Sequence, residues 1–197
     1  MDIEDWSLEA GAAEGVMGRI DLPGVEGGLV LKFDTRAATP SQAQVEAVQE
    51  FVAGWPALRR DLAEAMLAWW SAAAIGNRHV VPAPASPEEV WPAVWLNELH
   101  VPMTPAKGSR LLRVEGECDW ARERGLEIGV RDATELLYVG PIEGKALRDP
   151  RHASATNFAH PAVRDAALAG TPMDEQAFDE ARLAATAESK KPWWKPW

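Results

Sequence analysis

The residues whose chemistry could support catalysis or metal binding are few and widely separated. The four histidines are His79, His100, His152 and His160, and none has a His, Cys or carboxylate partner at the spacing of a zinc site. A metal site would therefore have to be assembled from distant segments. Cys118 is the only cysteine, so no internal disulfide can form, and no base near it in the sequence would activate the thiol. The sequence also lacks a phosphate loop and a nucleophile-elbow serine, so it predicts no catalytic residue, metal or cofactor.

Acidic residues gather in one stretch, where Glu115, Glu117, Asp119 and Glu123 lie on or beside a predicted strand. They indicate either a solvated sheet face or an acidic surface that binds a basic protein partner. The formal net charge of −10 is compatible with a basic partner. It argues against a nucleic-acid partner, because phosphates are bound by basic surfaces.

The last eight residues, 190–197, read Lys-Lys-Pro-Trp-Trp-Lys-Pro-Trp. Trp193, Trp194 and Trp197 are candidate partner-binding residues, because Trp often anchors protein interfaces. The two prolines favour an extended or polyproline conformation. Three interpretations stay open: docking on the same chain or on a second copy in a homodimer, docking on a foreign partner or membrane surface, and disorder.

The N-terminal residues are acidic and lack the pattern of a secretory signal, and no apolar run reaches the length of a membrane span. With a single cysteine, this composition predicts a cytoplasmic protein. The length of 197 residues predicts one domain with an appended tail. We place the boundaries at residues 1–144 for the main domain, 145–189 for a helical extension and 190–197 for the tail.

The first half of the chain predicts two strands followed by two helices. Apolar residues alternate with polar ones over residues 16–21 and 29–34, which is typical of a sheet covered on one side. A capping box at Thr39-Pro40-Ser41-Gln42 predicts the start of a helix. Because the residue before a proline avoids the helical region, Trp55-Pro56 predicts a break between two helices. We expect these helices to form an antiparallel pair on the sheet, with Trp69 buried.

The second half predicts a short helix, an antiparallel meander and a helical end. Residues 86–94 begin with a capping box, and residues 96–101 fit either an edge strand or an extended connection. Residues 112–117, 126–131 and 136–139 predict three strands, the last of them an inner strand because it is apolar on both faces. Residues 160–168 and 171–185 predict peripheral helices. The predicted fold class is α+β: an antiparallel sheet with a helix pair packed on one face, plus a C-terminal helical extension.

One motif resembles a known family. The run from Cys118 to Ile128 is similar to an uncharacterised bacterial domain family marked by strand, Trp-Asp-x-Glu-His-Gly-Leu and strand. The likeness covers roughly residues 14–144, and its matching positions are Trp120, Glu123, Gly125 and Leu126. Ala121 stands where the family has an acid and Arg124 where it has His, which favours a structural role for the motif. The family has no assigned reaction, and some members occur near polymorphic toxins, which implies an immunity role.

These observations favour a non-enzymatic protein-binding domain, specifically an immunity protein that covers a cognate, basic toxin. Two other classes remain: a hydrolase-like enzyme with a site assembled from dispersed residues, and a structural protein that oligomerises through its Trp tail. A pocket in which His and carboxylate side chains converge would favour the enzyme. A flat acidic patch would favour the binding protein.

Overall fold

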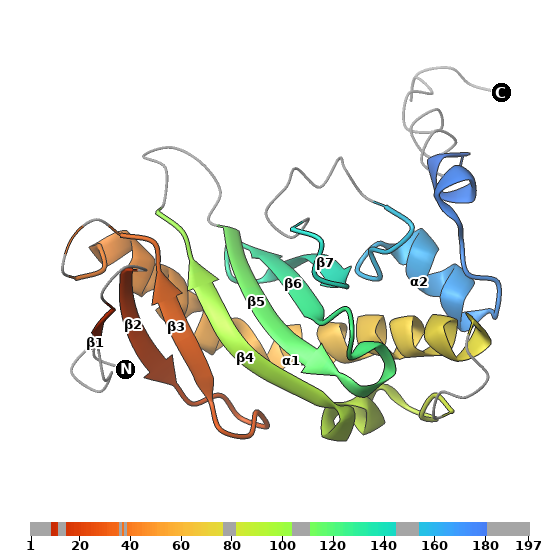
Figure 1. Ribbon diagram of the computed structural model, residues 1–197, viewed down its shortest axis with the longest axis horizontal. Helices are drawn as coiled ribbons and strands as arrows, with labels where there is room; N and C mark the ends of the chain where they lie inside the picture. The colour runs from red at the N-terminus through yellow and green to blue at the C-terminus, as the bar shows by residue number, and fades with distance from the viewer. Residues whose placement is uncertain are drawn as a thin grey trace, which may run out of the picture.

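The computed structural model describes residues 9–11, 15–35, 37, 39–76, 82–103, 111–144 and 154–180. Its centre is a seven-stranded sheet whose spatial order follows the chain order (Figure 1). The strands are β1 (Glu9–Gly11), β2 (Gly15–Ile20), β3 (Leu29–Phe33), β4 (Val94–Val101), β5 (Leu111–Cys118), β6 (Leu126–Arg131) and β7 (Glu135–Gly140). All neighbouring strands are antiparallel except β3 and β4, which run parallel.

The long helix α1 (Gln42–Gly76) connects the two parallel strands. A parallel pair needs a crossover connection, and α1 supplies it by running behind the sheet in Figure 1. We call the face that α1 covers the inner face and the opposite one the outer face. The crossover places β4 between β3 and β5 in the middle of the sheet. Residues 96–101 are therefore part of a strand, as one of the two interpretations from the sequence had it, but this strand is central and not at an edge.

The predicted break at Trp55-Pro56 is also wrong, because α1 continues through Pro56 as one helix of 35 residues. Pro56 lies on the exposed side of α1, where its ring faces solvent and the carbonyl that it leaves unpaired can be hydrated. On the buried side the apolar stripe keeps its phase across the proline. Its members are Val45, Val48, Phe51, Trp55, Leu58, Leu62, Met66 and Trp69.

The N-terminus of α1 is capped two residues later than the sequence predicted. The Ser41 hydroxyl accepts a hydrogen bond from the Gln44 amide (3.3 Å), and the Gln44 side chain accepts one from the Ser41 amide (3.0 Å). This reciprocal pair is a capping box. The buried Gln44 amide group also donates to the carbonyls of Asp34 and Val101, both 3.0 Å away. One side chain thus fixes the helix start to the ends of β3 and β4.

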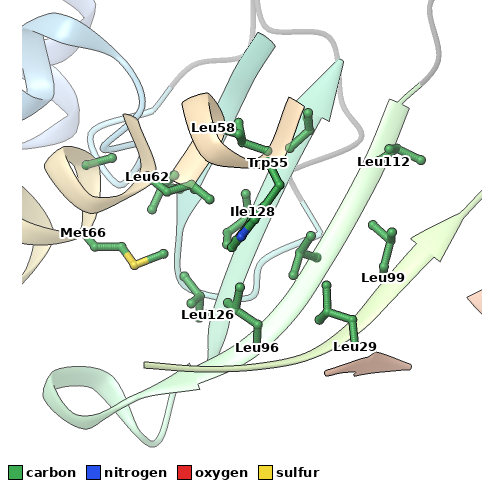
Figure 2. Close-up of a cluster of buried hydrophobic side chains, with 14 of the residues drawn as sticks. Leu29, Trp55, Leu58, Leu62, Met66, Leu96, Leu99, Leu112, Leu126 and Ile128 are labelled. Carbon is green, nitrogen blue, oxygen red and sulfur yellow. The ribbon is translucent and has the colours of Figure 1, made fainter. Parts of the chain in front are cut away.

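The hydrophobic core lies between α1 and the inner face. Figure 2 shows apolar side chains of α1 lying against those of the strands, including Leu29, Leu96, Leu99, Leu112, Leu126 and Ile128. Trp55 is fully buried at the centre of α1, and its indole N–H donates to the Pro23 carbonyl (3.0 Å). Burial of each large side chain contributes roughly 1.5–3 kcal/mol, so this interface supplies most of the driving force for folding.

The last strand is an edge of the sheet and not an inner strand, but its edge is covered. The Asn157 side chain donates to the Leu137 carbonyl (2.8 Å) and accepts from the Val139 amide (3.3 Å), and the Phe158 amide donates to the Val139 carbonyl (2.8 Å). This covering explains why β7 is apolar on both faces.

The chain then forms the predicted helix α2 (Pro161–Leu168), which packs against α1. A further helical stretch over residues 175–180 is capped by Asp174, whose carboxylate accepts from the Ala177 amide (2.8 Å). Its Phe178 is buried in the same core as the main domain. The predicted fold class is confirmed as α+β, with helices packed against a mostly antiparallel sheet and a C-terminal helix. None of the described helices combines the length and apolar character needed to cross a bilayer.

Replacing Pro56 by alanine should stabilise the protein. The change restores a backbone N–H inside α1 and removes the steric cost of the proline ring, which together stabilise the folded state by about 3 kcal/mol. The unfolded chain gains entropy at the same time, which offsets about 0.4–1 kcal/mol of this gain. We expect an unfolding free energy raised by about 2 kcal/mol in urea titrations. Ala53→Pro, on the same exposed side, is the control and should be strongly destabilising. A lower stability of Pro56→Ala would show that the core requires the proline.

Candidate functional site

The four acids predicted to form one surface separate into different environments. Glu115 and Glu117 lie on the outer face of β5, but Glu115 is half-buried and paired with Arg113 (3.1 Å). Asp119 lies in the short helix η3 (Asp119–Ala121) and is paired with Arg122. Glu117 and Glu123 are exposed and have no ion pair with any described residue. Trp193, Trp194 and Trp197 lie outside the described residues, so the predicted partner-binding set stays a prediction.

The outer face carries a charged cluster across β3, β4 and β5. The Lys32 ammonium lies 2.7 Å from the Glu98 carboxylate. The His100 Nε2 atom lies 3.3 Å from the Oε2 atom of Glu98 and 3.5 Å from the Oε2 atom of Glu115. Arg113 closes the cluster by contacting the other oxygen of Glu115. We call these five residues the outer-face cluster.

Strand register produces this arrangement. Lys32, His100 and Arg113 are opposite one another on three successive strands, and the carboxylates of Glu98 and Glu115 occupy the next row. Basic and acidic rows therefore alternate along the strands, and each charge has an opposite neighbour. Cross-strand pairs of this kind contribute roughly 0.2–1 kcal/mol each. The cluster is thus compatible with a structural ion-pair network, while its central histidine also has the chemistry of a ligand or a base.

Sequence reasoning missed Glu98 and His100. Their spacing of two residues places both side chains on one face of a strand, and that signal was present. It was not used because the sequence left residues 96–101 open between an edge strand and an extended connection, and it did not show that this segment pairs with residues 113–118.

The acidic row of Glu98 and Glu115 continues toward β7 at Glu127. The Glu127 carboxylate is opposite Glu115 in register and is fully buried on the outer side of β6. It accepts a hydrogen bond from the Glu143 amide (3.1 Å), and Arg113 lies 3.9 Å away. The segment after β7 thus folds over this end of the outer face and leaves β3, β4 and β5 as its more open part.

A groove of about 330 Å³ lies near the start of β4. Its walls are the loop between β2 and β3, including Glu26, and the junction of η2 (Pro87–Ala93) with β4. Trp95 lines the groove and is 42% exposed, whereas the other tryptophans in the described part of the chain are buried or half-buried. Glu117 is opposite Trp95 in the β4–β5 register. The ring of Trp91 also lines the groove, and the Arg59 guanidinium lies 4.6 Å from its centre.

The motif residues line a different cavity, of about 460 Å³, at the C-terminal end of α1. Trp120 stacks on Trp70 with ring centres 4.7 Å apart and meets Trp69 edge-on at 5.7 Å. Phe158 stacks on the other side of Trp69. The predicted burial of Trp69 is confirmed, but its aromatic partners come from η3 and residues 154–159. Arg122, Glu123 and Arg124 also line this cavity.

Gly125 has the positive φ that was expected of a tight strand connection, at 63°. A Cβ atom there would lie 2.5 Å from the end of the Ile142 side chain. The neighbouring Arg124 is paired with Glu143 at 2.8 Å. The motif therefore fixes the β5–β6 connection to the segment after β7.

Burial sets the protonation of the other titratable groups near these sites. Burial raises the pKa of the Cys118 thiol to about 12, so the thiol is protonated and unreactive at neutral pH. Burial also raises the pKa of Tyr138 above its ordinary range, and its hydroxyl donates to the Pro141 carbonyl (2.9 Å). Burial lowers the pKa of His160, which meets Phe178 edge-on.

Residues 14–147 match a domain of unknown function, DUF6985. The chain belongs to the DUF6985 family. This confirms the resemblance to an uncharacterised domain family, over nearly the same residues as the sequence suggested. No curated protein and no solved structure matches the chain. In this DUF6985 domain, the outer-face cluster, the Trp95 groove and most of the motif cavity all lie within the matched residues.

Gly125→Ala should lower the stability of this DUF6985 domain by about 1–2 kcal/mol, because alanine is strained at positive φ. Gly144→Ala is a matched control: Gly144 also has positive φ, at 64°, but a Cβ atom there would contact nothing. The difference between the two unfolding free energies isolates the contact with Ile142. Equal stability of Gly125→Ala and the wild type would contradict the structural role of the motif.

Stability should fall at alkaline pH partly because of Cys118. The unfolded thiol ionises near its ordinary pKa of 9.0, while the folded one stays protonated up to about pH 12. The unfolded state therefore binds fewer protons than the folded state between these values, and the unfolding free energy decreases as pH rises. Urea titrations at pH 8 and pH 10.5 should show a smaller decrease in unfolding free energy for Cys118→Ala than for the wild type, because the thiol no longer contributes. Some decrease should remain, because Tyr138 still contributes. An identical decrease in both proteins would contradict the assignment.

Proposed function

We propose that this DUF6985 domain is a non-enzymatic binding protein that recognises a basic protein surface, and that it acts as an immunity protein against a toxin in the cytoplasm. The observation that carries the proposal is the half-exposed Trp95 in a groove that also contains a carboxylate. An exposed indole in a concave site is a common anchor of protein interfaces. The motif in the sequence resembles a family of which some members occur near polymorphic toxins, and this resemblance supports the immunity role.

The chemistry of the groove favours an arginine or lysine of the partner. A cation placed over the Trp95 ring gains roughly 0.5–2 kcal/mol, depending on how far it is desolvated. Glu26 in the groove and Glu117 beside Trp95 would add charge complementarity. Arg59 over Trp91 provides the same interaction within the chain. The net charge of −10 would also attract a basic partner over a distance.

An enzyme with a site assembled from dispersed residues is the second candidate. One observation favours it: His100 converges with Glu98 and Glu115 from two strands. However, Lys32 and Arg113 already contact these carboxylates, and the cluster lines neither the Trp95 groove nor the motif cavity. We therefore rank the binding protein first.

The proposal predicts that Trp95→Ala weakens binding to the protein encoded by the neighbouring gene. That protein is the probe in this binding experiment. Loss of an anchor residue should cost about 2 kcal/mol, or roughly 30-fold in Kd by surface plasmon resonance. Met103→Ala is the control, because Met103 is another exposed apolar residue, 57% exposed, outside the groove. Glu117→Lys should mainly slow association, and the effect should shrink as salt rises.

Two outcomes would overturn the proposal. One is tight binding that Trp95→Ala leaves unchanged, and the other is no binding of that probe by the wild type. A dimer of this chain that Trp95→Ala dissociates would instead assign the groove to self-association. Glu115→Lys is unsuitable as a test, because it would also break the outer-face cluster.

A further inference from the structure

The geometry points to a divalent metal site of the zinc class on the outer face, with Glu98, His100 and Glu115 as its three protein ligands. This inference goes beyond the proposed function and does not depend on the Trp95 groove. It also departs from the sequence, which predicted no metal ligand.

The first argument is that electron-rich atoms converge. One imidazole nitrogen and two carboxylate oxygens lie within 4.8 Å of one another. The His100 Nε2 atom is shielded from solvent and makes no hydrogen bond within the described part of the chain. Lys32 and Arg113 each contact one of these carboxylates. A divalent cation held between the two carboxylate oxygens and the ring nitrogen would give Nε2 a partner as well.

The distances are also suitable for a shared ion. The Nε2 atom lies 3.3 Å from the Glu98 oxygen and 3.5 Å from the Glu115 oxygen. A tetrahedral ion with ligands at about 2.0–2.2 Å holds neighbouring ligand atoms about 3.3–3.6 Å apart. The two distances from His100 Nε2 are therefore compatible with a shared tetrahedral ion. An imidazole with two carboxylates is also a ligand set that suits zinc and related ions.

The surrounding cations orient the ligands. Arg113 contacts the Oε1 atom of Glu115 and leaves Oε2 directed at His100. Lys32 contacts the Oε2 atom of Glu98, which keeps a further lone pair for a metal. Such hydrogen-bonded partners are usual for metal-binding carboxylates.

The position of the cluster is also suitable for a site. All three ligands come from the central strands β4 and β5, which are fixed by pairing on both sides. Their side chains are 21–30% exposed, so an ion can enter from solvent. Three protein ligands leave one tetrahedral position for a further ligand, as in zinc sites that bind water or a substrate.

Zinc titration of the full, chelator-treated chain by calorimetry tests the inference. We expect one saturable equivalent, an affinity at least about 100-fold lower in His100→Gln, and at least about tenfold lower in Glu115→Gln. Glu117→Gln is the matched control, since it removes a carboxylate from the same face of β5 without touching the cluster, and it should bind as the wild type does. Circular dichroism verifies that each variant is folded.

Cobalt provides a second measurement on the wild type. Co²⁺ at this site should give the intense visible absorption of tetrahedral coordination, and excess zinc should remove it. Absence of saturable zinc binding by the wild type would overturn the inference. So would binding that His100→Gln retains, because the ion would then sit elsewhere, and so would a cobalt spectrum typical of six oxygen ligands.

Discussion

The contact between the apolar stripe of α1 and the inner face of the sheet organises this protein. A helix of 35 residues is about 52 Å long, and one side of it stays buried along nearly its whole length. The same helix is the crossover that makes β3 and β4 parallel and places β4 in the middle of the sheet. Gln44 at its start is hydrogen-bonded to the ends of both strands. Packing and topology thus depend on one element.

The chemistry of the outer face follows from this arrangement. Since the residues that face α1 are apolar, alternation along each strand directs the intervening residues outward. On β3, β4 and β5 several of these residues are charged or ionisable, and the register sets basic and acidic rows side by side. Ion pairs link the five residues of the outer-face cluster. His100 lies between two carboxylates, but its Nε2 atom makes no hydrogen bond within the described chain.

The far end of α1 explains why the chain continues beyond the sheet. Trp69 and Trp70 lie in its last turns, where they pack on Trp120 of the motif and, through Trp69, on Phe158. Residues 154–159 also cover the open edge of β7. The motif is thus part of an aromatic cluster that joins the helix, the β5–β6 connection and the C-terminal segment.

Local patterns in the sequence determined much of the secondary structure. Alternation of apolar and polar residues predicted the strands β2, β3, β5 and β6, although both faces of β6 are buried. Helical spacing correctly placed Trp69 on the buried stripe of α1. Gly125 was correctly expected at positive φ, because few other residues adopt it without strain. The local rule for proline failed at Pro56, since core contacts on both sides of it outweigh the lost hydrogen bond. The apolar residues keep their helical spacing on both sides of Pro56, and this spacing predicted the continuous helix better than the proline did.

Only the tertiary structure decided which segments meet. The sequence could not show that β4 is central, that β7 is an edge covered by Asn157, or that His100 lies between two glutamates. Each of these facts depends on pairing between residues far apart in the chain, whereas periodicity reports only which face a residue occupies. The candidate acids were found from the sequence, but their pairing with arginines was not. The fold class is therefore encoded in local patterns, and the chemistry of the outer face arises from strand order and register.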